Sequence, residues 1–292
     1  MLTHGGSVGG RGFNRMLTHD GSGRPGDDDG IRVSCLSACL RMAVRVLMAG
    51  EKMQVDYGLD RPPVVRRMFT RAGWTAAVGI ALFLINRKEY PGPSATLLAV
   101  FCAMGVIFAA LGGYMVWSSR TGKLALRDKL LDSLAFTGEE KVLDAGCGLG
   151  LMSIGAAKRL KTGKVTGIDS WDPAVLSGNS PEGAKANAKL EGVADKARFE
   201  AGDIRKLVYP EASYDVAVSA LEIHNLGDRE DRDKAVREMW RVLKPGGRLL
   251  IMDVLHVGEY AAILRGAGAD VTIESHGFLW CLPNKSVRAA KR

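Results

Sequence analysis

The sequence predicts an α/β protein in which an open, mostly parallel sheet carries helices on both faces and is preceded by two apolar helices. Three observations lead to this prediction. Residues 142–150 (VLDAGCGLG) read as a buried strand that runs into a glycine-rich turn and a helix. An acidic residue lies at or near the end of this strand and of two later predicted strands. Upstream, the charge-free residues 94–117 are long enough to span a membrane as a helix, and the shorter charge-free residues 72–86 are a marginal second span.

The turn after the first predicted strand is suited to a ligand that approaches the backbone closely. Asp144 lies near the end of the strand, and Gly146, Gly148 and Gly150 follow at alternate positions. Glycine adopts backbone conformations that are closed to other residues, and the helix start offers unpaired N–H groups. The dinucleotide fingerprint G-x-G-x-x-G would need glycine where Leu151 stands, which disfavours an NAD-dependent oxidoreductase. An ordinary strand-to-helix turn is the alternative.

This D-x-G-x-G-x-G pattern resembles the first motif of the class I S-adenosylmethionine-dependent methyltransferases. In that family the glycine loop accommodates an aminoacyl chain and a ribose. Residues 241–254 (RVLKPGGRLLIMDV) also resemble a recurrent signature of the family. The resemblance covers roughly residues 124–292. It implies a Rossmann-like, seven-stranded class I methyltransferase sheet and S-adenosyl-L-methionine as the cofactor.

Two further strands are predicted to end on carboxylates. Residues 164–169 (KVTGID) close on Asp169, and residues 197–203 (ARFEAGD) close on Asp203. An acid about 20 residues after the glycine turn is well placed to accept hydrogen bonds from ribose hydroxyls, which fits Asp169. The resemblance implies that Asp203 binds the adenine amino group, with the N–H of Ile204 nearby.

The remaining elements complete the predicted sheet. Residues 214–220 (YDVAVSA) form the fourth strand, and residues 228–243 form a helix that the PGG segment at 245–247 ends. Residues 248–254 are almost uniformly apolar, as expected for a strand covered on both faces. A helix over 259–269 and two final strands would supply the closing antiparallel pair that the resemblance implies.

The predicted cofactor site lies at the ends of these strands. Asp144 is expected to orient the loop and the methionine amino group, whereas Trp171 either stacks on adenine or packs at a strand end. The five cysteines show no zinc-type pairing of C-x-x-C modules, so no metal site is predicted. The predicted cofactor-binding residues are Asp144, Gly146, Cys147, Gly148, Gly150, Asp169, Trp171, Asp203, Ile204 and Ala220.

The candidate catalytic residues follow the fourth strand. Methyl transfer by in-line displacement depends mainly on alignment of the nucleophile with the sulfonium methyl group. A general base matters only if the acceptor is protonated at working pH. Glu222 and His224 are the candidates, and in an extended segment both side chains would point to one face. Histidine changes charge near neutral pH, but a loop histidine often bonds locally to the backbone instead.

Residues 1–67 are predicted to be a low-complexity, basic N-terminal region. The first 30 residues are rich in Gly, Ser and Asp, and we expect them to be disordered. Residues 31–50 are apolar, but Arg41 and Arg45 argue against a membrane span there. A mis-assigned translation start is an alternative explanation of this region. Internal candidate starts are Met42, Met48, Met53 and Met68.

Residues 68–119 are predicted to form a transmembrane hairpin. Residues 72–86 and residues 94–117 contain no charged side chain, and about 20 apolar residues are enough to span a bilayer as a helix. Basic residues are concentrated outside the hairpin on both flanks, which predicts that both ends lie in the cytoplasm. The protein would therefore be a multi-pass protein of the inner (cytoplasmic) membrane, with residues 120–292 as a cytoplasmic methyltransferase domain. A buried helix pair in a soluble protein is the alternative.

Charge and small residues suggest partners. The net charge of +8 comes largely from the hairpin flanks, where basic residues attract anionic lipid headgroups. No basic stripe is interleaved with aromatic residues, and we predict no nucleic-acid partner. Small residues recur at every fourth position in both apolar stretches, which fits packing within the hairpin or formation of a homo-oligomer. They are Gly73, Ala77, Ala81, Gly105, Ala109 and Gly113.

Two functions follow from the sequence. The first is S-adenosylmethionine-dependent methyl transfer to a small or lipophilic acceptor, a small-molecule or lipid substrate, at the cytoplasmic membrane face. The second is a non-catalytic S-adenosylmethionine-binding membrane protein that acts as a sensor or scaffold. The acids at the predicted strand ends fit both functions, although they favour the enzyme. The sequence does not specify O-, N- or C-methylation.

Overall fold

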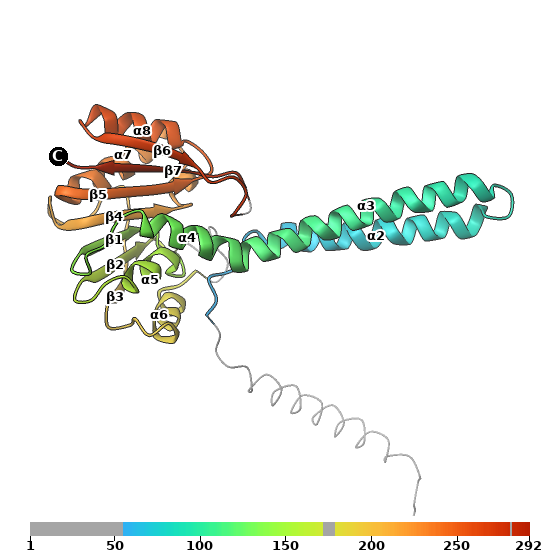
Figure 1. Ribbon diagram of the computed structural model, residues 1–292, viewed down its shortest axis with the longest axis horizontal. Helices are drawn as coiled ribbons and strands as arrows, with labels where there is room; N and C mark the ends of the chain where they lie inside the picture. The colour runs from blue at the N-terminus through green and yellow to red at the C-terminus, as the bar shows by residue number, and fades with distance from the viewer. Residues whose placement is uncertain (1–54, 172–178, 281) are drawn as a thin grey trace, which may run out of the picture. The chain divides into compact units, whose positions relative to one another are not determined.

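The computed structural model describes residues 55–171, 179–280 and 282–292. The segment over residues 1–54, with its predicted disorder and its alternative starts up to Met53, lies outside the described residues. The described chain contains two long helices and a seven-stranded sheet flanked by shorter helices (Figure 1).

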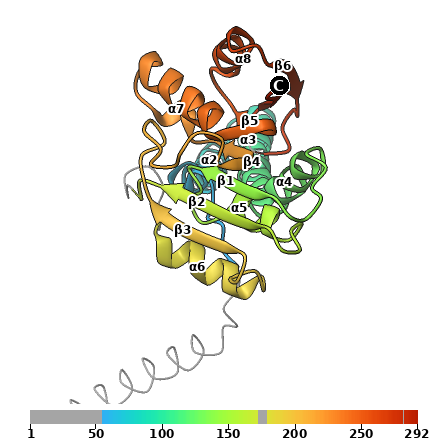
Figure 2. The ribbon, with the colours of Figure 1, turned by 90° about the vertical axis from the view of Figure 1, so that its left-hand side faces the viewer.

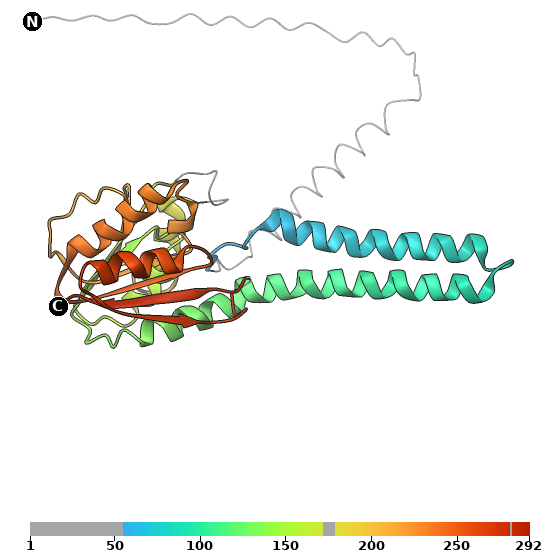
Figure 3. The same cartoon turned by 90° about the horizontal axis from the view of Figure 1, so that it is seen from above.

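Helices α2 (Pro62–Asn86) and α3 (Pro91–Trp117) form an antiparallel pair whose axes run side by side (Figures 1 and 3). Glycine allows this close approach. A Cβ atom on Gly79 would lie 2.6 Å from Cβ of Phe101, and one on Gly105 would lie 3.1 Å from the carbonyl oxygen of Ala72. By contrast, Gly113 faces open space. The small residues are therefore divided between the hairpin contact and the outer surface.

Both helices are long and apolar enough to cross a membrane. Only 6% of the most apolar 18-residue window is buried in Pro62–Asn86, and 11% in the continuous helix Pro91–Asp132. A helix pair in the core of a soluble protein would be mostly buried, so the hairpin does not form such a core.

The second long helix continues into the sheet domain without a break. One turn of π-helix, η1 (Ser118–Gly122), joins α3 to α4 (Lys123–Asp132), and Leu126, Leu130 and Leu131 of α4 are buried against the sheet. The basic residues after Trp117 were predicted to form a flank available to lipid headgroups. The structure corrects this for Lys123 and Arg127, which are only 2% and 4% exposed.

The sheet has the strand order β3-β2-β1-β4-β5-β7-β6. The first five strands in this order run parallel to one another, and β7 runs antiparallel to both β5 and β6. This is the Rossmann-like methyltransferase sheet that the sequence analysis predicted. The strands are β1 (Lys141–Ala145), β2 (Lys164–Asp169), β3 (Ala197–Ala201), β4 (Tyr214–Ala220), β5 (Leu243–Asp253), β6 (Asp270–Ser275) and β7 (Lys285–Ala290).

Helices cover both faces of the sheet (Figure 2). α4, α5 (Leu151–Ala157) and α6 (Pro181–Leu190) pack with one buried cluster, while α7 (Arg229–Val242) and α8 (Val257–Gly266) pack with the other. Alternate residues of each central strand enter opposite clusters, as Leu250 and Leu249 do in β5. Both faces of the sheet are therefore apolar, which explains the nearly continuous apolar runs in the sequence.

Two helix starts follow ordinary capping chemistry. The side chain of Ser180 accepts a hydrogen bond from the N–H of Gly183, and that of Asp228 accepts one from the N–H of Asp231. The end of α7 differs from the sequence prediction. The helix stops at Val242, and β5 already begins at Leu243, so the PGG segment lies within the strand as an irregularity in its pairing with β4.

The order of the strands positions the ligand site. The chain moves outward from β1 to β3, and then returns to β4 on the other side of β1. At such a switch point the connections after the two central strands diverge, which leaves a crevice beyond their carboxyl ends. The glycine-rich turn after β1 and the segment after β4 both lie at this crevice.

Candidate functional site

A cleft of about 410 Å³ lies at the carboxyl ends of the central strands. It is lined by the glycine-rich turn, the ends of β2 and β4, the chain before α2 and the connection between β6 and β7. The sequence-predicted residues in its wall are Asp144, Gly146, Cys147, Gly148, Asp169, Ala220, Glu222 and His224.

Asp144 lies in the floor of the cleft and is 1% exposed. Oδ2 accepts a hydrogen bond of 2.6 Å from the hydroxyl of Ser153, but Oδ1 has no partner within the described residues. Burial raises the pKa of this carboxyl to about 7, with Ser153 opposing the shift and the charge of Asp169 adding to it. A buried acceptor without a partner is costly, and it suits a cationic group entering the cleft.

The three glycines of the turn have different structural roles. Gly146 has a φ of 77°, and a Cβ there would lie 2.0 Å from Cγ of Glu222, so only glycine fits beneath that side chain. Gly148 donates its N–H to Oδ2 of Asp169 at 2.8 Å. Gly150 precedes α5 with a φ of 85° and packs close to Phe199, outside the cleft wall.

Asp169 fixes the geometry of the turn. Besides Gly148, its carboxylate accepts hydrogen bonds from the N–H of Trp171 at 2.8 Å and from Nδ2 of Asn179 at 3.1 Å. The residue is 4% exposed. An ionised carboxylate offers about four lone-pair sites, so three bonds leave acceptor capacity for a ligand hydroxyl.

Four sequence-predicted residues do not line the cleft. Asp203 is exposed and bound to the guanidinium of Arg205, whose hydrogen bonds hold the pKa of the carboxyl below its usual range. Ile204 is buried among the residues under α7, and Trp171 is partly buried against the opposite cluster. Gly150 is the fourth. An adenine contact by Asp203 would require Arg205 to release it.

Glu222 and His224 come together at the far side of the turn. They lie on either side of Ile223, at the start of a short 3-10 turn, η2 (Ile223–Asn225), that follows β4. Burial raises the pKa of Glu222 to about 7, and the nearby charge of Asp169 adds to the shift. This carboxyl can therefore hold or release a proton near neutral pH.

A buried acid that was not predicted from the sequence lies beside His224. Nδ1 of His224 is 2.6 Å from Oδ1 of Asp253, whose side chain is fully buried at the end of β5, but this close contact lacks hydrogen-bond geometry. The backbone N–H of His224 donates to Oδ2 of Asp253 at 3.1 Å, and the hydroxyl of Tyr260 donates to the same oxygen at 3.2 Å. With Nδ1 turned to Asp253, Nε2 is the ring nitrogen left for a ligand.

The wall opposite the turn comes from the base of the two long helices. Oδ2 of Asp60 accepts hydrogen bonds from Ser119 at 2.9 Å and from Nε1 of Trp280 at 2.8 Å. Lys123 donates to the carbonyl of Tyr57 at 2.9 Å and lies 3.9 Å from Asp60. Burial lowers the pKa of Lys123, with Asp60 opposing the shift. Asp60, Lys123, Trp280 and Tyr57 all line the cleft.

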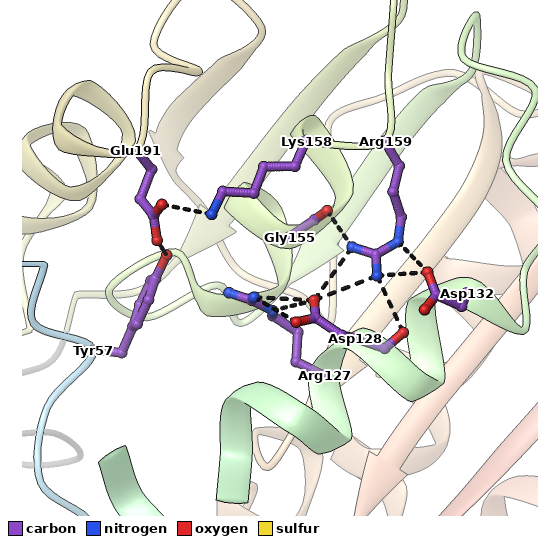
Figure 4. A network of polar contacts seen from close by, with 8 residues as sticks. All are labelled: Tyr57, Arg127, Asp128, Asp132, Gly155, Lys158, Arg159 and Glu191. Carbon is purple, nitrogen blue, oxygen red and sulfur yellow. Dashed lines mark hydrogen bonds and ion pairs between the residues drawn. The ribbon is translucent and has the colours of Figure 1, made fainter. Parts of the chain in front are cut away.

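A polar network holds this wall against the sheet domain (Figure 4). The hydroxyl of Tyr57 donates to Glu191 at the end of α6, and Lys158 at the end of α5 bonds the same carboxylate. Nearby, Arg159 bonds Asp128 and Asp132 of α4. The chain before α2 and the helix after α3 are therefore both attached to the helices around the turn.

Some of these residues carried a signal in the sequence. Asp253 ends the apolar run of β5, just as the three recognised acids close earlier strands, so the same rule would have found it. Asn179 follows the second strand and could have been read as a partner of Asp169. Asp60 and Trp280 carried no such signal, because only the fold brings them within 2.8 Å across 220 residues of sequence.

Comparison with known proteins identifies the domain. Residues 142–247 match the family described as "Methyltransferase domain". The chain is 35% identical to methyltransferase GfsG of Streptomyces halstedii, over 50% of this chain and 58% of that protein. It is 35% identical to a 27-O-demethylrifamycin SV methyltransferase of Amycolatopsis mediterranei, over 47% of each. The chain therefore spans about half the length of the curated relatives it matches.

One further relative and one solved structure have similar descriptions. A ubiquinone/menaquinone biosynthesis C-methyltransferase of Bdellovibrio bacteriovorus is 32% identical, over 44% of this chain and 49% of that protein. A crystal structure of a SAM-dependent methyltransferase from Aquifex aeolicus is 22% identical, with a TM-score of 0.47, and covers 57% of this chain and 89% of that chain. Together, the family match, the named relatives and the seven-stranded sheet show that this chain carries a class I S-adenosylmethionine-dependent methyltransferase domain.

Proposed function

We propose that this protein transfers a methyl group from S-adenosylmethionine to a small or lipophilic acceptor, with His224 as the general base. The contact of 2.6 Å between Nδ1 of His224 and Oδ1 of Asp253 carries the proposal. A protein that only binds the cofactor needs the glycine-rich turn and its acids, but it has no need of a histidine whose ring nitrogen lies next to a buried carboxylate beside the cofactor pocket.

The residues of the cleft fit the cofactor. The unpartnered Oδ1 of Asp144 would accept the α-ammonium group, and the free acceptor sites of Asp169 would accept ribose hydroxyls. The glycines at 146 and 148 would let the methionine portion lie against the backbone. Asp203 and Ile204 remain candidates for the adenine only if the Asp203–Arg205 pair opens. When bound, S-adenosylmethionine supplies an electrophilic methyl group on a positively charged sulfur.

The side chains after β4 would bind the acceptor and take its proton. Asp253 bonds the backbone N–H of His224 and lies beside Nδ1 of its ring, so that Nε2 can take a proton from an acceptor hydroxyl or amine as that atom becomes methylated. The proton then resides on the imidazole, where the buried carboxylate stabilises the positive charge. Glu222, with its pKa of about 7, can hydrogen-bond the acceptor as a neutral acid or take a proton itself. His224 touches the acceptor in this scheme, whereas Asp253 is a positioning residue.

We place this reaction at a membrane surface. Two helices are long and apolar enough to span a bilayer, and few residues of their apolar stretches are buried. An enzyme anchored in this way meets lipid-soluble molecules at high local concentration, which favours a lipophilic acceptor. Basic residues just before α2 and in its first turns favour a cytoplasmic location for the domain.

The test uses the full-length protein in phospholipid nanodiscs with methyl-labelled S-adenosylmethionine and a total lipid and metabolite extract. Wild-type protein is expected to label one fraction of the extract. His224→Asn and Asp253→Asn should lower kcat by about 10²–10⁴-fold, while calorimetry shows an unchanged Kd for the cofactor.

The matched control is His256→Asn. His256 lies 3.2 Å from Glu259 but does not line the cleft, and Asn tolerates its left-handed backbone. This variant should retain wild-type turnover. Tight cofactor binding without transfer to any fraction would refute the enzyme and leave the sensor or scaffold. Full activity in His224→Asn would refute the proposed base.

A further inference from the structure

The connection between β6 and β7 lies along the end of the long helix α3–η1–α4. The hydroxyl of Tyr114 donates to the carbonyl of Phe278, and that of Ser118 donates to the carbonyl of Leu279 at 3.3 Å. At Gly122 a Cβ would lie 2.0 Å from the carbonyl oxygen of Leu279, so the two backbones touch there as well. Tyr114, Ser118 and Gly122 are spaced by four residues, and the connection therefore follows one face of the helix.

The same connection exposes apolar side chains at the level where α3 ends. Phe278 is 62% exposed, and Leu279 and Leu282 are also exposed to solvent. Tyr114 and Trp117 lie in the last turn of α3, beside this group. Tyr and Trp at the end of an apolar helix are typical of the membrane–water interface. The exposed side chains are thus placed where α3 would leave a bilayer.

Trp280, between these exposed residues, belongs to the cleft instead. It is 6% exposed, and its Nε1 donates to Asp60 in the cleft wall. Leu282 also lines the cleft. A single short connection therefore has one side at the cleft and one side at the level of the helix end.

The distance between these two places is short. Lys123, in the cleft wall, follows Trp117 by six residues on a continuous helix, which corresponds to about 9 Å along the axis. The headgroup layer on each side of a bilayer is about 6 Å thick. The mouth of the cleft would therefore open just above the headgroups. Arg61 lines it, and the exposed Arg120 lies in η1 between Trp117 and Lys123.

We propose that the β6–β7 connection is a membrane-interface element that admits an amphiphilic acceptor from the bilayer into the cleft. The acceptor has an apolar tail, which stays along Phe278 and Leu279, and a polar reacting head, which passes Trp280 to reach Glu222 and His224. This inference rests on the proposed function, because it names the substrate class of the same site. It also requires that α3 spans the bilayer.

The first experiment needs no methyl transfer. Full-length Phe278→Trp and Val208→Trp proteins are reconstituted into vesicles of phosphatidylcholine and phosphatidylglycerol that carry brominated acyl chains. Val208 is 88% exposed on the connection between β3 and β4 and is the matched control. The tryptophan added at 278 should be quenched relative to wild type, and the one at 208 should not. Equal quenching at the two positions would overturn the inference.

The second experiment measures transfer from labelled cofactor into the lipid and water-soluble fractions of a total extract. The double variant Phe278→Ser, Leu279→Ser should raise the KM for the lipid acceptor about tenfold, because the tail loses its apolar contact. Cofactor Kd, measured by calorimetry, should be unchanged.

Results that contradict the amphiphile inference can be distinguished from results that contradict the proposed function. Labelling of the water-soluble fraction alone, or an unaltered KM in the double variant, would overturn the amphiphile inference and leave the methyltransferase standing. If the wild type binds cofactor without transfer, the proposed function fails, and the quenching result still decides whether the connection enters the membrane.

Discussion

The carboxyl of Asp144 is the group whose state should change most when the cleft fills. It is buried, one of its oxygens has no partner within the described residues, and burial raises its pKa to about 7. A raised pKa in an acid means that the folded protein prefers the protonated form. The contribution to stability is then complete below the unfolded pKa, near 3.8, and is lost as the pH rises through about 7.

We therefore expect Asp144→Asn to change how stability depends on pH. As the pH rises from about 4 to about 8, the Tm of the wild type should fall relative to that of the variant, because only the wild type must bury an ionising carboxyl. Thermal denaturation of both proteins across this range is the measurement. A constant difference in Tm would contradict the assignment of the raised pKa to Asp144.

Gly146 offers a second prediction at this scale. Gly146→Ala should destabilise the protein by about 2 kcal/mol or more, through the cost of a positive φ and a methyl group placed against Glu222. Cofactor binding should weaken as well. Gly258→Ala is the control, since an added methyl group there meets nothing within 4 Å in α8. Chemical denaturation and calorimetry of the two variants would show whether the loss is specific to the turn.

Among the elements, strands were easier to predict than their surroundings. β2 and β4 have the predicted bounds because each is an apolar run that begins and ends at polar residues or turns. The start of β5 could not be found in this way. Proline and two glycines usually end a strand or helix, whereas here pairing with β4 and backbone hydrogen bonds between Gly246, Gly247 and Lys291 continue the strand from Leu243. Likewise, the continuity of α3 with α4 depends on packing of α4 against the sheet.

The packing of α2 against α3 gives a prediction at the scale of elements. Gly105→Leu should separate the helices, because its side chain would enter the space occupied by the backbone of Ala72. Gly113→Leu should not, because Gly113 faces open space. Protease sensitivity of the hairpin in detergent micelles would distinguish the two. Equal sensitivity would mean that the small residues serve another contact, such as one between two copies of the chain.

For the whole molecule, membrane attachment is the property with the clearest test. After alkaline carbonate extraction, we expect the full-length protein to stay in the membrane pellet. The double variant Val106→Arg, Ile107→Arg should be released, because each arginine near the centre of a span costs about 2.5–3.5 kcal/mol. Val208→Arg, at a surface position of the sheet domain, should remain in the pellet. Release of the wild type would refute the spanning hairpin.

The sequence predicts site residues that are close together along the chain, but not those that the fold brings together from distant segments. The turn, Asp144 and Asp169 could be predicted because their spacing along the chain reflects their contacts. The cleft wall around Asp60 could not, since Trp280 and Ser119 reach it from distant segments. The adenine contact of Asp203, which the resemblance implied, stays a prediction, and in the structure its carboxylate is bound to Arg205.

The unbroken passage from α3 into α4 has a mechanical consequence. A flexible linker would let the sheet domain reorient freely above a bilayer, whereas a continuous helix of 42 residues, about 63 Å long, is a rigid connection. If α3 spans a bilayer, any tilt that a thicker or thinner bilayer imposes on α3 would be transmitted to α4 and to the sheet. The height and inclination of the domain would thus be set by lipid thickness.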